Sequence, residues 1–284
     1  MGRYRKILVA IDGSESSKNA LRQAIKFADI EKCWITVVSV IPPYEGDLGL
    51  TSVGNMVKAM REPCEKALAE AEEIAKAERA SIRTVCEEGD AYERIVDLAD
   101  AENFDLIVMG RKGRSQIERA LIGSVTARVI GHSQRDVLVV PENTIIGWKS
   151  VLLTTDGSKY SEAAIDKAVN FAKSYGGELV IVSVVDVTEE FMARSPGMVE
   201  EMVKKAKGFV DDAKKKAEVS NITTKTFVRE GEAYRVITNL AKDQKADIII
   251  MGSHGRTGLK RLLMGSVTAK VIGYTPCPVL VVKP

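Results

Sequence analysis

The stretch Gly110-Arg111-Lys112-Gly113, followed by Gly123-Ser124, decides how this chain folds, because its spacing returns as Gly252-Ser253-His254-Gly255 with Gly265-Ser266. An apolar run typical of a buried parallel strand precedes each copy, and apolar residues at helical spacing follow each Gly-Ser. The repeated unit is therefore predicted to be a strand, a glycine loop and a helix.

A loop of this kind suits an anion. Glycines let main-chain N–H groups approach a ligand without a Cβ in the way, and a helix start adds unpaired N–H donors and a positive dipole end. A single copy is often no more than a turn. Two copies with one spacing favour a phosphate or nucleotide site, because a ligand fixes the loop length. Basic side chains in both copies are candidate partners for the anion: Arg114, Arg119, Arg256 and Arg261.

Length and charge limit the class of protein. The chain has 284 residues, and the 142 residues from Gly110 to Gly252 are one repeat, which predicts domains at 1–142 and 147–284 with a linker from Pro141 to Gly147. A net charge of +2 with interleaved acids and bases gives no argument for nucleic acid. No apolar stretch is long enough for a bilayer, and the first residues lack the apolar segment of a signal peptide. We expect a soluble cytoplasmic protein without a membrane partner.

Cysteine and histidine give no sign of a metal site. The two histidines, His132 and His254, are too few and too far apart for a metal cage, so no metal ligand is predicted. The cysteines have no C-x-x-C spacing, which argues against zinc and against a redox pair. We expect four buried free thiols: Cys33, Cys64, Cys86 and Cys277.

Apolar strands alternate with helices in both halves. Strands are predicted at 6–11, 34–41, 81–86, 105–109 and 136–140, and then at 150–155, 178–185, 223–228, 247–251 and 279–282. Helices are predicted to end near Ala28 and Arg79 and to span 92–101, 158–175, 198–218 and 234–244. This alternation predicts an α/β fold with parallel sheets, and right-handed crossovers place helices on both faces.

An aspartate follows the first strand of each half. In such a sheet, ligands bind beyond the carboxyl ends of the strands where the strand order reverses. Asp12 and Asp156 can accept hydrogen bonds there from sugar hydroxyls, while the glycine loop holds phosphates. The alternative is that Asp-Gly-Ser only turns the chain and caps a helix. We assign Ser14 and Ser158 as helix caps and both aspartates to the ligand.

At these residues the chain resembles the universal stress protein family over nearly its whole length, as two tandem domains. The pattern G-x2-G-x9-G-(S/T) is similar to that of the family's ATP-binding branch. The resemblance implies two Rossmann-like open parallel sheets, each of five strands in the order 3-2-1-4-5. It also implies ATP, ADP or AMP as ligand, with Mg²⁺ or Mn²⁺ carried by the phosphates. Such proteins pair through their last strands, so the chain resembles a dimer made covalent, an intramolecular pseudo-dimer that can also form a homodimer.

The resemblance also implies a set of nucleotide residues. The main chain of Val40 and Val184 faces adenine, and Asp12 and Asp156 contact the adenosine. The phosphate loops and the helix starts after them comprise Gly110, Gly113, Gly123, Ser124, Val125, Thr126, Gly252, Gly255, Gly265, Ser266, Val267 and Thr268. Neighbouring positions complete the set: Ala10, Met109, Lys112, Thr154, Met251 and His254.

Two departures from the family pattern favour the second site. The family often has a histidine within the first glycine pair, which His254 keeps and Lys112 does not. The first copy also has Glu118 where the second has Lys260, and an acidic side chain near a triphosphate is unfavourable.

Other nucleotide folds do not fit the sequence. The chain has neither the P-loop pattern nor a G-x-G-x-x-G after its first strand, and it lacks the Ser-Gly-Gly loop of ATP pyrophosphatases. No motif joins a nucleophile to a base, so no catalytic residue is predicted. The leading hypothesis is an ATP-binding regulatory module in stress response. A slow Mg- or Mn-dependent ATP hydrolase and a nucleotide-free interaction protein are the alternatives.

Overall fold

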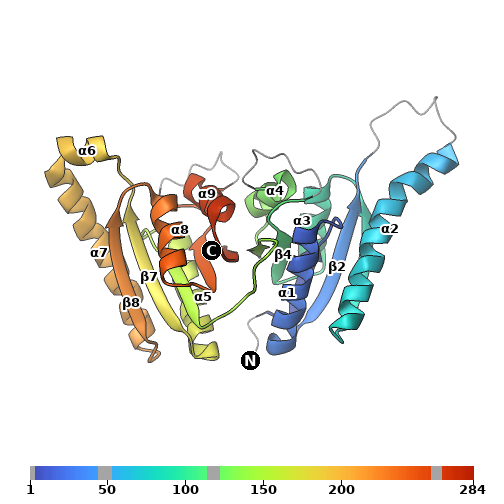
Figure 1. The fold of residues 1–284 in the computed structure, drawn as a ribbon, viewed down its shortest axis with the longest axis horizontal. Helices are drawn as coiled ribbons and strands as arrows, with labels where there is room; N and C mark the ends of the chain where they lie inside the picture. The colour runs from blue at the N-terminus through green and yellow to red at the C-terminus, as the bar shows by residue number, and fades with distance from the viewer. Residues whose placement is uncertain (1–3, 44–52, 114–121, 257–263) are drawn as a thin grey trace. The chain divides into compact units, whose positions relative to one another are not determined.

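The computed structural model describes residues 4–43, 53–113, 122–256 and 264–284. The chain divides into two compact units, Met1–Asn143 and Thr144–Pro284. Each unit has its own parallel strands and its own covering helices (Figure 1).

In the first unit, strands and helices alternate as predicted. The elements are β1 (Lys6–Ala10), α1 (Glu15–Glu31), β2 (Trp34–Ile41), α2 (Val53–Ala77), β3 (Ile82–Glu88), α3 (Ala91–Ala101), β4 (Leu106–Gly110), α4 (Ser124–His132) and β5 (Asp136–Val140). The strands lie in the order β3-β2-β1-β4-β5, and neighbouring strands run parallel.

The second unit repeats this order with one addition. Its elements are β6 (Ser150–Thr154), α5 (Lys159–Tyr175), β7 (Glu178–Val185), α6 (Glu189–Arg194), α7 (Pro196–Glu218), β8 (Thr224–Glu230), α8 (Ala233–Asp243), β9 (Ile248–Gly252), α9 (Ser266–Tyr274) and β10 (Val279–Val282). The strands lie in the order β8-β7-β6-β9-β10. The predicted fold class, with strand order 3-2-1-4-5 in each half, is confirmed. The short helix α6 was not predicted.

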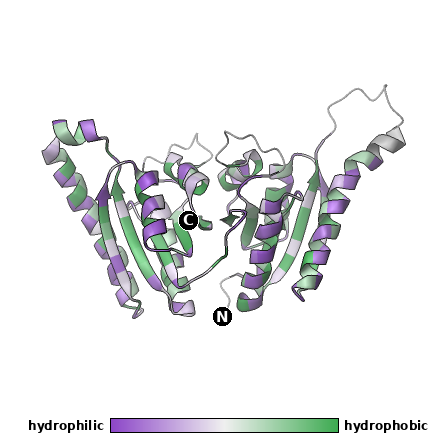
Figure 2. Cartoon of the chain, viewed as in Figure 1, coloured by the Kyte–Doolittle hydropathy of each residue, from purple (hydrophilic) through white to green (hydrophobic). Residues whose placement is uncertain are grey.

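Helices cover both faces of each set of strands. In the first unit α1 packs beside α2, and α3 packs beside α4; in the second, α5 packs beside α7 and α8 beside α9. Crossovers that move in opposite directions from the first strand place these pairs on opposite faces. The inner strands are accordingly mostly apolar, shown in green in Figure 2, and Ile7, Leu8 and Val9 are fully buried. The outer strands β3 and β8 also carry charged residues and are partly exposed.

The serine caps are confirmed at the start of α1 and α5. The Ser14 hydroxyl accepts a hydrogen bond from the Ser17 amide at 3.2 Å, and Ser158 accepts one from the Ser161 amide at the same distance. Each hydroxyl therefore pairs one of the N–H groups that a helix start leaves without a partner.

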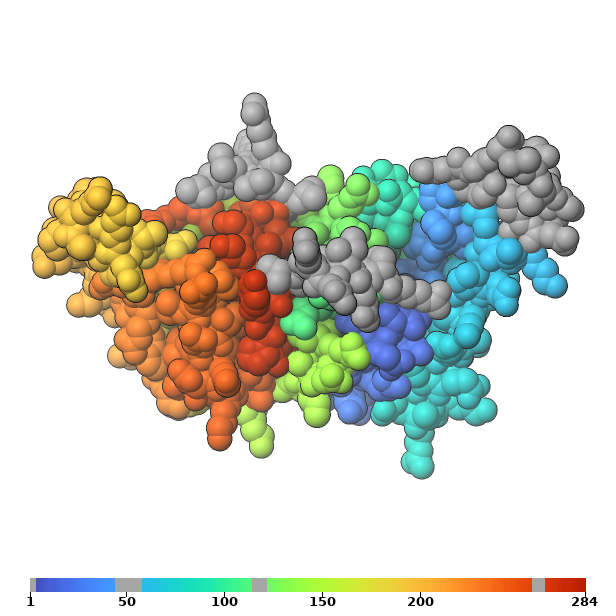
Figure 3. Space-filling view, turned by 45° about the horizontal axis from the view of Figure 1, so that its top comes forward, coloured from blue at the N-terminus to red at the C-terminus, as the bar shows by residue number. Residues whose placement is uncertain are grey.

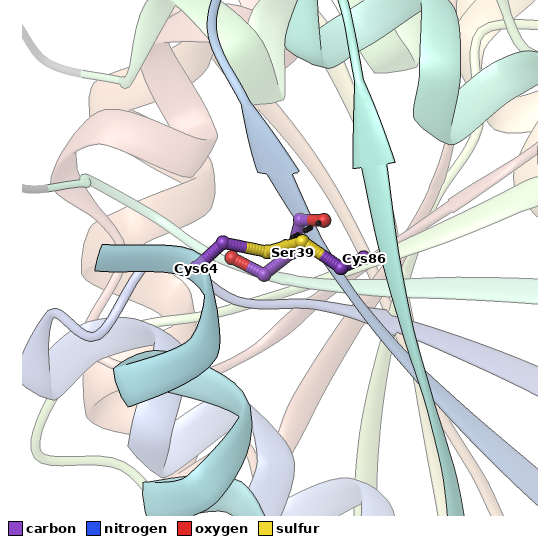
Figure 4. Close-up of a disulfide and its surroundings, with 3 residues drawn as sticks. All are labelled: Ser39, Cys64 and Cys86. Atoms are coloured by element: carbon purple, nitrogen blue, oxygen red, sulfur yellow. Dashed lines mark hydrogen bonds between the residues drawn. A yellow bond between two sulfur atoms is a disulfide. The ribbon is translucent and has the colours of Figure 1, made fainter. Parts of the chain in front are cut away.

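The expectation of four free thiols is wrong, because Cys64 and Cys86 form a disulfide (Figure 4). Pairing of β2 with β3 places Cys86 in register with Ser39, and α2 covers the two strands. The Cys64 sulfur lies 3.5 Å from the Ser39 carbonyl oxygen, so three segments meet at this bond. A sequence separation of 22 residues carries no spacing signal for such a pair. Cys33 and Cys277 are free.

Candidate functional site

A tight turn holds one oxygen of the aspartate that follows the first strand of each unit. Gly13 has φ of 80° and Gly157 has φ of 74°, in the left-handed region that favours glycine. The Ser14 amide donates to Asp12 Oδ1 at 3.0 Å, and the Ser158 amide donates to Asp156 Oδ1 at 3.0 Å. Both turns are therefore closed by the aspartate side chain.

The other carboxylate oxygen faces the glycine loop. A Cβ built on Gly113 would lie 2.5 Å from Asp12 Oδ2, and one built on Gly255 would lie 2.8 Å from Asp156 Oδ2. In the second unit the Arg256 amide also donates to Asp156 Oδ2, at 2.9 Å. The structure thus brings each predicted aspartate against the second glycine of its loop, where a larger residue would strike the carboxylate.

The first glycine of each loop has a packing role. A Cβ on Gly110 would lie 2.8 Å from the main chain of Ser16 and Ser17, and one on Gly252 would lie 2.8 Å from Tyr160. These contacts belong to α1 and α5, which cross the ends of β4 and β9. The close approach of helix and strand is therefore enough to require glycine here, without any ligand.

Each loop closes on its helix in the same way. The Gly123 amide donates to the Arg111 carbonyl and the Gly265 amide to the Ser253 carbonyl, both at 2.9 Å. The hydroxyls of two threonines tie the first helical turn to the strand end, Thr126 to Gly110 at 3.0 Å and Thr268 to Gly252 at 3.1 Å. The amides of Gly123 and Gly265 are thus already paired within the loop.

The starts of α4 and α9 are suited to an anion. Neither helix has a side-chain hydrogen bond at its N-cap glycine in the described part of the chain. The first-turn amides belong to Ser124, Val125 and Thr126 in one unit and to Ser266, Val267 and Thr268 in the other. Amides at this position point outward along the helix axis and add the positive dipole end.

The main chain of Val40 and Val184 points past the end of the first strand. The carbonyls of Val38 and Val182 accept from the Ile11 and Thr155 amides at 2.9 Å, so these carbonyls face β1 and β6. Main-chain groups two residues along a strand point the same way. The N–H and C=O groups of Val40 and Val184 therefore point beyond the last residues of β1 and β6 that pair with β2 and β7. Main chain that faces adenine would have to point this way.

The remaining predicted positions lie around these features. Ala10 and Met109 are paired in register at the ends of β1 and β4 and are buried. Met251 is buried and Thr154 half-buried at the matching strand ends of the second unit. Ala10, Met109 and Met251 are apolar, whereas Thr154 carries a hydroxyl.

The loops differ in their charged side chains. In the first, Arg111 and Lys112 are half-buried, and burial lowers the pKa of the Arg111 guanidinium. In the second, His254 Nδ1 lies 3.2 Å from the Ser253 hydroxyl, and the imidazole packs 5.2 Å from the Tyr160 ring.

The predicted basic partners are only partly observed. Arg114, Arg119 and Arg261, together with Glu118 and Lys260, lie outside the described residues. Arg256 is described, and its guanidinium lies 5.4 Å from the centre of the Phe209 ring of α7. The same ring would meet a Cβ on Gly157. Sequence reasoning missed Phe209, since its place beside the turn depends on how α7 packs.

A hollow of about 430 Å³ in the second unit lies away from these residues. It is lined by α6, α7 and the end of β8, including Met192, Val199, Lys204 and Glu230. Figure 3 shows α6 in yellow at this edge of the unit. The hollow shares no residue with the predicted nucleotide set.

In the described part of the chain, no cluster of three or more histidine, cysteine, aspartate or glutamate side chains is arranged to hold a metal ion. No helix in the same residues is long and apolar enough to cross a membrane.

Comparison with known proteins gives one family. The universal stress protein family matches residues 3–141 and again residues 147–283. A universal stress protein of Methanocaldococcus jannaschii is 37% identical over 140 residues, which cover 48% of this chain and 82% of that protein. One from Mycolicibacterium smegmatis is 24% identical and covers 98% of this chain and 97% of its own length. The crystal structure of a universal stress protein from Archaeoglobus fulgidus has a TM-score of 0.72 and 25% identity, covering 98% of this chain and 96% of that one.

Proposed function

The chain belongs to the universal stress protein family, and from that premise we propose that it is a regulatory module that binds adenine nucleotide at two sites, one in each unit. ATP is the proposed ligand, with ADP or AMP as lower-charge forms. The nucleotide controls what the protein does in a stress response.

One arrangement, present twice, carries this proposal. A carboxylate, the second glycine of the loop and a helix start without a side-chain cap lie beyond the first strand. The contact of Asp12 with Gly113 and that of Asp156 with Gly255 bring the first two together. Helix amides and the helix dipole favour phosphate, and the carboxylate favours ribose hydroxyls. The outward main chain of Val40 and Val184 supplies a donor and an acceptor for the edge of a purine.

Binding rather than turnover is proposed because no sequence motif joins a nucleophile to a base. The 3.2 Å contact of His254 Nδ1 with the Ser253 hydroxyl joins two neighbouring residues of the loop itself. We propose that Mg²⁺ or Mn²⁺ arrives on the phosphate oxygens of the nucleotide, since no cluster of acidic side chains among the described residues is arranged to hold a metal ion. Slow hydrolysis helped by that cation is the enzyme-class alternative.

Two measurements separate these readings. Mass spectrometry of gently purified protein tests for bound ATP, ADP or AMP. Incubation with ATP and Mg²⁺ then shows whether the nucleotide is consumed. Protein that carries no nucleotide and binds none would leave only the nucleotide-free interaction protein.

Two glycine substitutions test the loop assignment. A Cβ at Gly123 or Gly265 would meet nothing closer than 3.4 Å, so a side chain fits without unfolding the loop. Gly265→Val together with Gly123→Val should place side chains where phosphate sits and abolish ATP binding in calorimetry. Each single variant should keep one site.

The control is Gly208→Val, the same change at a position of α7 where a Cβ would meet nothing within 4 Å. It should bind ATP like the unmodified chain. A folded double variant with unchanged ATP affinity would contradict the loop assignment.

We also propose that the domains, 1–142 and 147–284, pair as a pseudo-dimer through their closing strands β5 and β10. Both strands are short apolar runs at the end of a domain, and an exposed edge of this kind invites pairing. A chain cut at Pro141 should then dimerise or aggregate in light scattering, whereas a stable monomer would argue against pairing.

A further inference from the structure

The Cys64–Cys86 disulfide joins a helix to an edge strand close to the first proposed nucleotide site. Cys64 is buried on α2, and Cys86 is exposed on β3. Thr84, two residues before Cys86 and on the same face of the strand, donates to Glu72 of α2 at 3.0 Å. The bond therefore adds a covalent link to a polar contact between the same two elements.

The chain path connects this bond to the nucleotide site. Figure 4 shows Ser39 between the two cysteines, with its carbonyl oxygen 3.5 Å from the Cys64 sulfur. Ser39 directly precedes Val40, whose main chain is proposed to face adenine. A change at the disulfide is thus one residue away from a ligand-facing part of β2.

Helix α2 contains a proline directly before its disulfide-bonded cysteine. Pro63 lies inside α2, and proline removes one helical hydrogen bond and crowds the preceding turn. Cys64 follows Pro63 directly, so the disulfide fixes α2 to the sheet one residue after the proline. Without the bond, only non-covalent contacts such as that of Thr84 with Glu72 hold α2 to β3.

The exposed cysteine gives a reductant access. Thiol–disulfide exchange needs a thiolate to reach one sulfur of the bond, and exposed disulfides are the ones that exchange readily. The two free cysteines do not compete, because burial raises the pKa of Cys33 and of Cys277 to about 11. Both are therefore protonated and unreactive near neutral pH.

We propose that Cys64–Cys86 is a thiol–disulfide site that a small dithiol opens, and that its opening weakens nucleotide binding at the first site and not at the second. The second half of this inference rests on the proposed function. A thiolate of the dithiol attacks Cys86 Sγ, the Cys64–Cys86 bond breaks, and Cys64 leaves as a thiolate that takes a proton. The second thiol then loses its proton and attacks the mixed disulfide. Cys86 is released and protonated, and the oxidised dithiol carries away the disulfide bond as two electrons reduce the protein.

The second unit is an internal control. Val228 of β8 lies in register with Ser183, as Cys86 does with Ser39, and it cannot form a disulfide. Ala206, 142 residues after Cys64 as Gly252 is after Gly110, is buried on α7. The second unit has no such bond to open, so the proposal expects a redox effect at the first site and none at the second.

The test uses the full chain, oxidised or treated with dithiothreitol. Alkylation after unfolding should label only Cys33 and Cys277 in the oxidised protein, and all four cysteines after reduction. Gly265→Val isolates the first site and Gly123→Val the second. Reduction should weaken ATP binding at the first site by at least about 5-fold, the low end of ordinary couplings between sites. Binding at the second site should not change.

Two cysteine variants, made in the Gly265→Val background, sharpen the test. Cys86→Ser, at an exposed position, should match the reduced protein in ATP affinity and no longer respond to dithiothreitol. Cys33→Ser should behave like its parent. Amide hydrogen exchange in α2 should rise on reduction, while exchange in α7 stays constant.

The outcomes separate the two proposals. Four labelled cysteines without reductant would refute the disulfide site. ATP binding at the first site that ignores reduction would refute the inference and leave the proposed function standing. Absence of ATP binding at both sites in both redox states would refute the proposed function, and with it the proposed effect of the disulfide on nucleotide binding. The amide hydrogen exchange of α2 would still decide whether the disulfide holds the helix.

Discussion

The two units build the same main-chain arrangement from different side chains. Both close the glycine loop through one amide-to-carbonyl bond at 2.9 Å and tie the next helix to the strand with a threonine hydroxyl. Between the glycines, the first unit has Arg111 and Lys112 where the second has Ser253 and His254. The repeated features are main-chain and threonine hydrogen bonds, so the two units share the backbone geometry of the loop more than its side chains.

The units also differ just before their first strands, at the end of the sheet away from the glycine loops. In the first, the Tyr4 hydroxyl donates to Asp136 at 2.8 Å. In the second, the matching Trp148 stacks on Phe171 at 4.2 Å and on Tyr175 at 5.0 Å. Equivalent strands therefore begin in different packing environments, and matched substitutions in the two units should have unequal effects.

The largest difference in stability is expected at Gly177 and its counterpart Cys33. Both follow a left-handed residue and donate to the carbonyl five positions earlier, at 3.1 and 3.2 Å. A Cβ on Gly177 would lie 1.9 Å from the Trp148 carbonyl oxygen. Gly177→Ala should lower the free energy of unfolding by at least about 3 kcal/mol, because main chain must move.

Urea unfolding of Gly177→Ala and Cys33→Ala measures this contrast. Cys33→Ala should cost less than about 1 kcal/mol, since it only shortens a half-buried side chain. Equal losses in the two variants would show that the close approach of Trp148 to Gly177 is not what requires glycine.

A middle-sized effect is expected at the helix caps. Ser14→Ala and Ser158→Ala each remove a cap and should each cost about 1 kcal/mol of stability. The Ser14 hydroxyl also donates to Asp12 Oδ1 at 2.6 Å. Ser14→Ala should therefore also weaken ATP binding at the first site, in calorimetry with the second site blocked by Gly265→Val.

Ser158→Ala, with the first site blocked by Gly123→Val, is the matched measurement. We expect the two variants to lose equal free energy of unfolding, and only Ser14→Ala to lose ATP affinity. This result would show that the serine hydroxyl has a second role in the first unit alone. An unchanged first-site affinity would remove the proposed role of the Ser14 hydroxyl in orienting Asp12.

The smallest effect is expected where α1 and α5 end. Lys32 and Gly176 both adopt left-handed conformations, with φ of 56° and 67°. A Cβ on Gly176 meets nothing within 4 Å, so only backbone strain opposes a side chain there. Gly176→Lys should lower the free energy of unfolding by about 1 kcal/mol, because lysine is strained in this conformation. Lys32→Gly should raise it by less than about 1 kcal/mol, because the strain that glycine removes is partly offset by its greater freedom in the unfolded chain. A melting temperature that changes in the same direction for both variants would contradict this expectation.

Local patterns in the sequence predicted most of the fold. Apolar runs gave the strands, and Asp-Gly-Ser predicted the turn and the caps that Ser14 and Ser158 provide. The repeated spacing predicted the helices that begin at Ser124 and Ser266. Each of these depends on residues a few positions apart, which interact in almost any α/β protein.

Other parts of the site could not be predicted from such patterns. The first glycine of each loop was assigned to phosphate, yet helix packing already requires it, at Gly110 by α1 and at Gly252 by α5. Phe209 beside the second turn gave no signal, and the short helix α6 was missed because six residues are too few to show a periodicity.

The sequence by itself determined the strand and helix order, the helix caps and the twofold repeat of a glycine loop. Only the tertiary structure decided that Cys64 and Cys86 bond, that Asp12 meets Gly113, and that Gly177 lies against Trp148. The physical reason is that spacing along the chain encodes hydrogen bonds within a few residues. Contacts between distant segments are fixed by strand register and helix packing, which bring together residues that no sequence interval relates.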